Sequence, residues 1–355
     1  MKKTLFALAC GSLLATSAFA QSSVTLYGIA DVSIRYSSNT NDSNSSVIRM
    51  TDGAISQSRW GIKGSEDLGG GLKGVFRLEN GFSLDNGSNN SSSSFFNRMA
   101  YVGLEGNFGA VTLGRQHSAI HDFLLDFDPL TVGNYEENAY YVGMYPIRVN
   151  NQIKYAGSFG GLNVIAGYGF GEQAGNATAG RYMGTMVTYK AGPFGFGGAY
   201  QQSRGGGNAG SAVTLGGTDS DKLTNWAVGA TYTVGALKAA AGYQDHRMKE
   251  SIGGTFKTNV WYAGLTYNVT PALALTGAGY YSRPKDEVPG LADQKGKRYT
   301  LVALAEYSLS KRTQVYGTVD YTNVKDLALG DLNNAGKTSL DKNRTNVGIG
   351  IRHIF

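Results

Sequence analysis

The feature that most constrains this chain is a period-two pattern of side chains that recurs from Val24 to the last residue. In the first such segment, the even positions from Val24 to Ile34 carry no polar side chain, whereas the odd positions include Asp31 and Arg35. This alternation indicates a β-strand that lies between two unlike environments. The segments are about 8–13 residues long, which is enough for a tilted strand to cross a bilayer.

The connections between these segments alternate between short and long. The short ones lie near 67–71, 107–109, 158–161, 191–193, 234–235, 269–271 and 309–311. The long polar ones lie near 37–55, 85–94, 118–147, 174–180, 204–221, 247–256, 283–297 and 325–342. Seven short and eight long connections join sixteen strands. Successive antiparallel strands place their connections on opposite sides of a membrane, and outer-membrane barrels have turns on one side and loops on the other. The sequence therefore predicts an all-β fold, a 16-stranded antiparallel transmembrane β-barrel formed by residues 21–355; a β-rich soluble secreted protein is the alternative.

The first twenty residues have a basic start, an apolar centre and the ending Ala18-Phe19-Ala20, a pattern typical of a secretory signal peptide. A signal anchor is the alternative. Removal of residues 1–20 would also remove Cys10, the single cysteine of the chain, so we exclude a disulfide-stapled fold. No later segment approaches the roughly 20 apolar residues of a membrane helix. The net charge of +6 comes from scattered basic residues, which argues against a nucleic-acid partner.

The connection at residues 118–149 is unusually long, acidic and aromatic, and has no sustained helical or alternating pattern. Its acidic residues are Asp122, Asp126, Asp128, Glu136 and Glu137. Loops of this length in compact proteins are usually functional or disordered, and this much apolar surface favours packing over disorder. We expect the segment to fold inside the barrel as its third loop and to narrow the bore.

Several runs of the sequence closely resemble the general porins of betaproteobacterial outer membranes. These runs are Ser23–Asp31, Ser58–Gly69, Asn97–Leu104, Phe108–Gln116 and the final Arg352–Phe355. The resemblance spans nearly the whole chain after residue 20. It implies a bacterial outer-membrane location, a homotrimer, and passive diffusion of small hydrophilic solutes past an inward-folded third loop. The terminal Phe355 resembles the family's signal for the barrel-insertion machinery, and the location implies contact with outer-membrane lipids and lipopolysaccharide.

In that family, basic residues of the barrel wall face acidic residues of the third loop at the constriction. The resemblance carries over to Arg59, Arg98 and Arg148, and by parity to Arg35; Arg77 and Arg115 follow from their strand positions. Asp126 and Asp128 are the first candidates on the loop, followed by Glu136, Glu137 and Asp122. Because the basic candidates outnumber the two favoured acids, we expect a weak preference for anions.

Other motifs give no support for catalysis, a cofactor or a metal site. The glycines Gly69-x-Gly71-x-x-Gly74 match a dinucleotide fingerprint, but a strand rather than a helix follows them. His117 and His121 are four residues apart, yet no accompanying glutamate motif completes a metal pair. No Gly-x-Ser-x-Gly nucleophile motif occurs.

The sequence thus favours a general-diffusion porin that catalyses no reaction and is charge-selective at its constriction. Two alternatives stay open. One is a porin selective for a substrate such as a sugar or an anion, with the loop tyrosines as a binding track. The other is an outer-membrane adhesin or enzyme whose long loops carry the activity.

Overall fold

The computed structural model describes residues 23–41, 43–133, 144–205, 218–251, 253–326 and 343–355. The predicted signal peptide lies outside these residues. The described strands are β1 (Ser23–Ser37), β2 (Val47–Asp52), β3 (Arg59–Gly69), β4 (Leu72–Gly81), β5 (Met99–Gly106), β6 (Gly109–His117), β7 (Arg148–Phe159), β8 (Leu162–Gly169), β9 (Tyr182–Ala191), β10 (Phe194–Arg204), β11 (Lys222–Val234), β12 (Leu237–Lys249), β13 (Thr255–Asn268), β14 (Leu273–Glu287), β15 (Gln294–Lys295), β16 (Lys297–Ser308), β17 (Thr313–Lys325) and β18 (Asn343–Ile354). The helix α2 (Ala119–Phe127) lies between β6 and β7.

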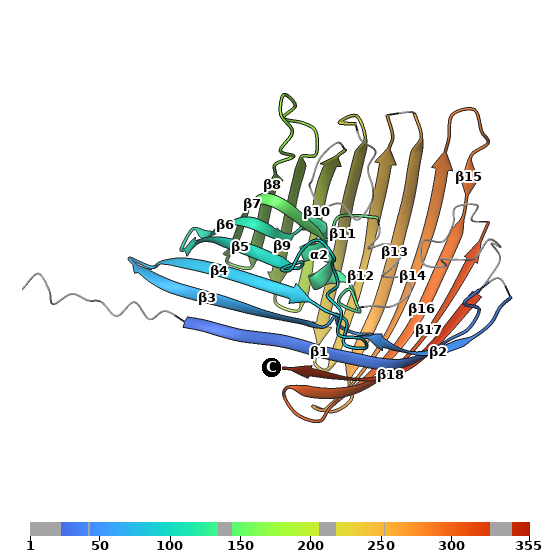
Figure 1. The fold of residues 1–355 in the computed structure, drawn as a ribbon. Coiled ribbons are helices and arrows are strands. Elements are labelled where there is room, and N and C mark those ends of the chain that lie inside the picture. The colour runs from blue at the N-terminus through green and yellow to red at the C-terminus, as the bar shows by residue number, and fades with distance from the viewer. Residues whose placement is uncertain (1–22, 42, 134–143, 206–217, 252, 327–342) are drawn as a thin grey trace, which may run out of the picture.

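The strands form one closed antiparallel sheet in which each long strand pairs with its neighbours in the sequence (Figure 1). The sheet closes where β1 pairs with β18, from Ile29 opposite Ile354 to Ser37 opposite Asn346. Among the eighteen strands of the described residues, β2 and β15 are short additions of 6 and 2 residues. The other sixteen are the predicted strands, and the prediction of a 16-stranded antiparallel barrel is confirmed.

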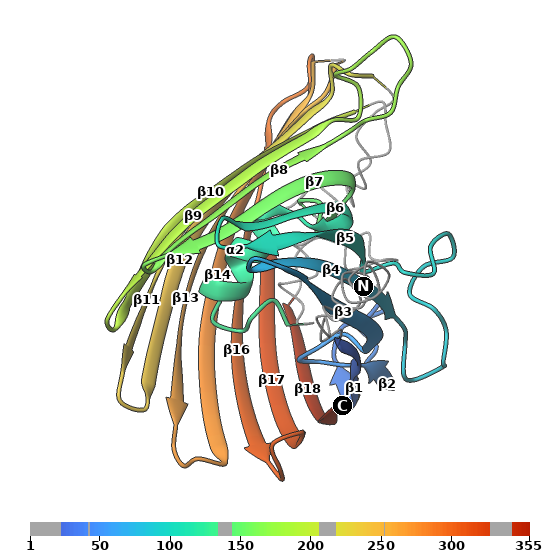
Figure 2. The same ribbon diagram turned by 90° about the vertical axis from the view of Figure 1, so that its left-hand side faces the viewer.

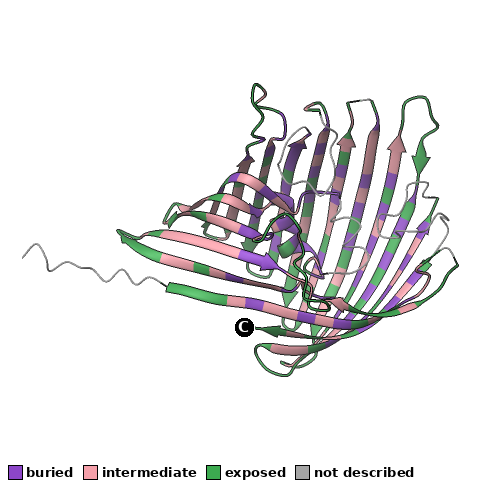
Figure 3. Cartoon of the chain, in the orientation of Figure 1, coloured by how far each residue is buried: buried purple, intermediate pink, exposed green. Residues whose placement is uncertain are grey.

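The two faces of the strands have opposite polarity, with polar side chains inside and apolar side chains outside. On β16, Thr300 is 0% exposed whereas the adjacent Leu301 is 56% exposed. On β17, Asp320 is buried and Val319 is exposed. The same alternation runs along the strands in Figure 3. A soluble sheet would bury its apolar face, so this inverted arrangement is that of a barrel surrounded by lipid.

Aromatic side chains mark the loop end of the outward face. The rings of Trp226, Tyr243, Trp261 and Tyr281 form a row across β11–β14, with centroids 5.0, 5.2 and 5.7 Å apart. Near the turn end, Tyr232 and Tyr267 are exposed on the same face. Trp226 and Tyr232 are six residues apart on β11, about 20 Å along the strand. Aromatic side chains towards both ends of the outward face are the arrangement of the two aromatic girdles of an outer-membrane barrel.

The first long connection differs from the expectation of a polar outer loop over 37–55. Its second half forms β2, which pairs with β1 from Val32 opposite Asp52. The following residues, 53–58, leave the sheet before β3 begins at Arg59. The apolar character of Ala54 and Ile55, both buried, explains why this part does not remain in water. No helix in the described part of the chain has the length and apolarity that a membrane crossing requires.

The last residue takes part in barrel closure. The backbone N–H of Phe355 donates to the carbonyl of Gly28 at 3.1 Å, and the N–H of Gly28 donates to the carbonyl of Phe355 at 3.0 Å. The Phe355 ring lies over Gly28, where a Cβ atom would be 2.2 Å from Cζ of that ring. Glycine at this position therefore makes room for the terminal aromatic ring.

We predict that Gly28→Ala destabilises the barrel by about 1–3 kcal/mol, the usual range for overpacking. The added methyl group also meets the carbonyl oxygen of Arg59 at 2.7 Å, so ring and backbone must both shift. Urea unfolding of the refolded protein, followed by tryptophan fluorescence, measures the effect. Gly277→Ala on β14 is the matched control, because its Cβ would meet no atom within 4 Å. Equal stability of the two variants would contradict the role of Gly28 in making room for the Phe355 ring.

Candidate pore constriction

The connection 118–149 begins with the helix α2. Ser118 has an extended backbone, and its side chain accepts a hydrogen bond from the His121 N–H, which is the geometry of an N-cap. Ile120, Phe123, Leu124 and Phe127 are buried at the i, i+3, i+4, i+7 spacing of one helix face. The expectation that this segment has no helical pattern is therefore wrong. The helix is only nine residues long, which is short for recognition from periodicity.

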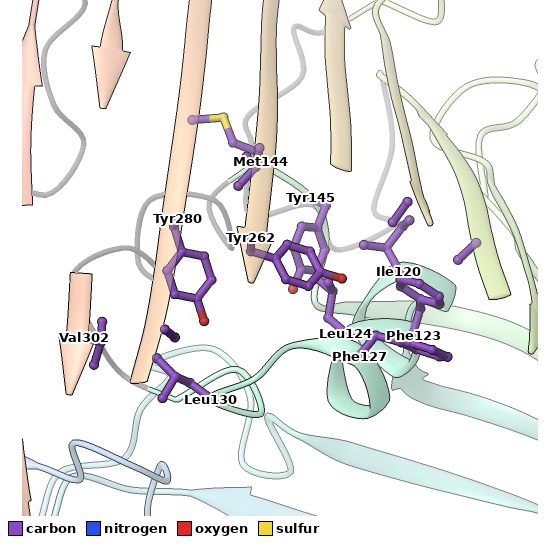
Figure 4. Close-up of a cluster of buried hydrophobic side chains, with 14 of the residues drawn as sticks. Ile120, Phe123, Leu124, Phe127, Leu130, Met144, Tyr145, Tyr262, Tyr280 and Val302 are labelled. Atoms are coloured by element: carbon purple, nitrogen blue, oxygen red, sulfur yellow. The ribbon is translucent and has the colours of Figure 1, made fainter. Parts of the chain in front are cut away.

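The helix lies between β3–β7 on one side and β10–β14 on the other in both views of the barrel (Figures 1 and 2). Its apolar face packs on β9–β12. Phe123 and Phe127 stack with ring centroids 4.6 Å apart, and Leu124 lies near Tyr262 in the same cluster (Figure 4). Packing of this kind holds the segment against the wall by burial of apolar surface.

Glycines in the wall provide the space for this contact. A Cβ atom at Gly229 on β11 would lie 3.2 Å from both Phe123 and Phe127. At Gly264 on β13, a Cβ atom would lie 2.5 Å from Cβ of Pro129. The close approach of loop and strand therefore requires residues without side chains at these two positions.

The predicted loop acids have three different environments. Asp122 accepts a hydrogen bond from Lys154 Nζ on β7 and lies 3.1 Å from His117 Nδ1. Asp126 is 41% exposed, and its carboxylate is 3.6 Å from Lys190 Nζ near the turn end of β9.

Asp128 is buried, whereas the sequence predicts that it faces the pore. Its carboxylate accepts from the Tyr280 hydroxyl at 2.6 Å and from the Val132 N–H at 2.7 Å. This contact ties the end of α2 to β14. Glu136 and Glu137 lie outside the described residues, and the orientation of the loop acids stays a prediction.

The wall arginines are organised by a carboxylate that the sequence analysis missed. Glu79 on β4 is 1% exposed. It accepts from Arg98 Nε at 2.7 Å, from Arg77 Nη2 at 2.6 Å and from the Tyr27 hydroxyl at 2.9 Å. A signal was available, because Glu79 shares the inward parity of Arg77 on the same strand.

The remaining wall arginines lie on neighbouring strands. Arg115 donates from Nε to the carbonyl of Asn97 at 2.9 Å and contacts the Asn150 side chain. Arg148 stands at the first position of β7. Arg35 pairs with Asp320 of β17 at 2.6 Å, so it belongs to a separate part of the wall from the Glu79 cluster.

Between this wall and the loop lies a cavity of about 250 Å³. Its lining includes wall residues, helix residues and residues that follow the helix in the loop: Arg59, Arg98, His117 and Arg148 on the wall, His121 and Leu125 on α2, and Thr131, Val132 and Gly133 after it. Burial, with the nearby His117 and Arg148, lowers the pKa of the His121 imidazole well below its usual range, so that ring is neutral at physiological pH. No carboxylate lines the cavity among the described residues. Its fixed charge is therefore positive.

Comparison with known proteins identifies the family. A model of the Gram-negative porin family matches residues 4–327. The chain belongs to this family. It is 36% identical to outer membrane porin protein 32 of Delftia acidovorans, over 100% of both chains.

Two solved structures of outer-membrane proteins are similar in fold. An anion-selective porin from Comamonas acidovorans superposes with a TM-score of 0.76 at 29% identity, over 94% of this chain and 100% of that one. A trimer form of the Vibrio cholerae outer-membrane protein OmpT superposes with a TM-score of 0.67 at 19% identity, over 94% of this chain and 99% of that one.

The protein is therefore an outer-membrane porin, a channel for passive transport, and not an enzyme; these predictions are confirmed by the family. The predicted tyrosine track is not visible in the described residues, since Tyr145 is fully buried and Tyr135, Tyr140 and Tyr141 lie outside them. Nor does the described part of the chain gather three histidine, cysteine or carboxylate groups that could hold a metal ion.

We predict that Tyr280→Phe loosens the loop, because it removes a hydrogen bond to the buried carboxylate of Asp128. Hydrogen bonds to charged groups contribute about 1.5–3 kcal/mol. The expected results are a lower unfolding midpoint and more frequent current flicker in single-channel recordings. Tyr262→Phe is the control, because its hydroxyl has no hydrogen-bond partner in the described part of the chain. An equal increase in flicker in the Tyr280→Phe and Tyr262→Phe variants would refute the role of the contact between Tyr280 and Asp128.

Proposed function

We propose that this porin is a general-diffusion channel whose constriction favours small anions over cations. The observation that carries the proposal is the positive lining of the cavity between the wall and the loop. Arg59, Arg98 and Arg148 line it, and Glu79 is the carboxylate in direct contact with their cluster. Of the loop acids that the structure describes, Asp122 is paired with Lys154 and Asp128 is buried, so these two offset the positive charge little. The anion-selective Comamonas porin, similar over 94% of this chain, supports the same sign.

The proposed constriction residues are the arginines at 35, 59, 77, 98, 115 and 148, facing the loop 118–149 with Asp126 as the exposed acid. A permeating ion at such a site lies within the screening length of about 8 Å at physiological salt. Each fixed charge there influences which ions pass, whereas charges on distant turns are screened. No observation favours a dedicated substrate track, so the general channel is the function supported best.

We predict that Arg148→Ala shifts the zero-current potential in a salt gradient towards cation selectivity. Removing one positive charge at the narrowest part lowers the permeability of anions and raises that of cations, each by roughly fivefold at low salt, as expected for unit charges about 4 Å apart in water. Planar-bilayer recordings at 0.1 M and 1 M salt measure the shift, and screening lengths of about 10 Å and 3 Å predict that it shrinks at the higher concentration. Arg312→Ala in an exposed turn is the control. An unchanged potential in the Arg148 variant would place this side chain away from the narrowest part.

We also propose a homotrimer that forms through the outward face where the barrel closes. Ile34, Met50 and Ile349 are exposed there, and a groove of about 590 Å³ lined by apolar side chains runs across β1, β17 and β18. The trimer form of the Vibrio protein, which is similar in fold, supports the oligomeric state. A second copy of the chain would cover this groove.

We predict that Ile349→Asn reduces the trimer that survives in detergent at moderate temperature. The substitution places a polar amide in the proposed apolar interface. Leu265→Asn is the control, because Leu265 is exposed to a similar extent on β13, 54% against 65%. Seminative gel electrophoresis over a temperature series measures the trimer fraction. If the control weakens the trimer more, the interface lies on another face.

Three further assignments belong to the same proposal. Residues 1–20 act as a cleaved signal peptide, and residues 21–355 form the barrel. Phe355 serves as the recognition signal for the insertion machinery, which its position at the closing seam supports. The outward face beyond the aromatic row on β12–β14 contacts the charged headgroups of lipopolysaccharide; Arg247, Lys257, Arg283 and Lys285 alternate there with the period of the rings.

A further inference from the structure

Residues 53–58 interrupt the barrel wall and fold towards its interior. β1 pairs with β2 as far as Val32 opposite Asp52 and resumes with β3 at Ile29 opposite Arg59. The six residues between therefore stand opposite only Ala30 and Asp31. They cannot continue the ladder in so short a length and must leave the sheet.

Asp31 holds this inward segment in place. Its carboxylate accepts from the Ser56 N–H at 2.8 Å and from the Tyr316 hydroxyl of β17. The backbone carbonyl of Asp31 accepts from the Gly53 N–H at 2.7 Å and from the Ser58 hydroxyl at 3.1 Å. Asp31 therefore binds both ends of the segment. A carboxylate with these partners, 0% exposed, fixes the segment against one strand.

The segment is turned towards the loop. Ala54 and Ile55 are buried in the same apolar cluster as the α2 residues. Ile55, Ser56 and Gln57 line the cavity that the loop residues Val132 and Gly133 close from the other side. The cavity is thus bounded by the arginine wall, the loop and this second inward segment.

Gln57 is the member of the segment that contacts the charge cluster. Its backbone carbonyl accepts from Arg59 Nε at 2.9 Å, and its side-chain oxygen accepts from Arg98 Nη1. Arg98 also contacts Glu79, so Gln57 and Glu79 together fix the direction of this guanidinium. Gln57 remains partly exposed, which leaves it in contact with the cavity.

We infer that residues 53–58 form a second constriction element, in which Gln57 determines charge selectivity and Asp31 is a positioning residue. The inference rests on the proposed anion-favouring constriction and deepens it. Gln57 is neutral and contacts both Arg59 and Arg98. A charge introduced at position 57 would therefore weaken or strengthen the positive field that a passing ion meets there.

The test is a charge series at position 57 in the full-length trimer. At low salt, Gln57→Glu should lower the permeability of anions and raise that of cations, each roughly fivefold, and Gln57→Lys should do the reverse, so the anion-to-cation ratio moves in opposite directions. A residue that only supports the fold would not move the ratio in opposite directions with its charge. Gln173→Glu and Gln173→Lys are the controls, because Gln173 is exposed in an outer loop and its charge is screened.

Thiol chemistry gives a second readout that needs no charged substitution. The chain has one cysteine, Cys10, in the predicted signal peptide, so Gln57→Cys would introduce the single thiol of the processed protein. Bilayer recordings with anionic and cationic methanethiosulfonate reagents should show a stepwise loss of current at Gln57→Cys, faster with the anionic reagent. Gln173→Cys should be labelled without a change in current.

Asp31 is tested in combination with the series. In an Asp31→Asn background the difference between Gln57→Glu and Gln57→Lys should shrink at least about twofold, because the segment is no longer held by a charged acceptor. A difference that stays unchanged would overturn the positioning role. If Asp31→Asn does not assemble, Ser58→Ala, which removes the hydroxyl bonded to the Asp31 carbonyl, serves the same purpose.

The two proposals fail in distinguishable ways. A wild-type channel without anion preference would contradict the proposed function. An anion-selective wild type whose selectivity and current ignore both the charge and the thiol at position 57 would overturn this inference alone.

Discussion

Backbone hydrogen bonding within a closed sheet is the constraint on which the rest of this structure depends. A strand in hydrocarbon cannot leave its N–H and C=O groups unpaired, because each costs several kcal/mol. The pairing of β1 with β18 removes the last two edges, and the terminal Phe355 completes that seam through Gly28. Once the sheet is closed, every strand has one face in lipid and one face in the bore. The side-chain pattern, the aromatic rows and the polar interior all follow from this division.

Charge inside the barrel is organised by buried carboxylates. Glu79 is in contact with two arginines and a tyrosine, and Asp320 pairs with Arg35. Removing such a partner would leave an uncompensated charge in a partly dehydrated wall. The carboxylates therefore keep the guanidinium groups in fixed positions while the cluster around the cavity stays positive. Asp31 binds backbone N–H groups of residues 53–58 rather than a cation, and so holds that segment in place.

The loop and the wall are fitted to each other through shape. Gly229 and Gly264 leave space on β11 and β13 for the helix and for Pro129. The buried Asp128 then connects the end of the helix to Tyr280. An apolar helix face, two wall glycines and one carboxylate together hold the described part of the loop, residues 118–133, against the wall.

The sequence by itself determined the fold, the number of long strands, the family and the inward parity of the wall arginines. It could do so because a membrane barrel imposes a strict period of two, and because turns and loops alternate on opposite sides of the membrane. The runs around Trp60 and Tyr101 carried the family resemblance, and the family model agrees with it.

Only the tertiary structure decided what contacts what inside the bore. Asp128 looked like a pore acid in the sequence, yet it is buried against β14, a strand about 150 residues further along the chain. Glu79 and Gln57 did not stand out, because their importance comes from arginines on other strands. Parity says which side of a sheet a residue occupies, but not which distant side chain contacts it there, and in this barrel those contacts set the charge of the cavity between the wall and the loop.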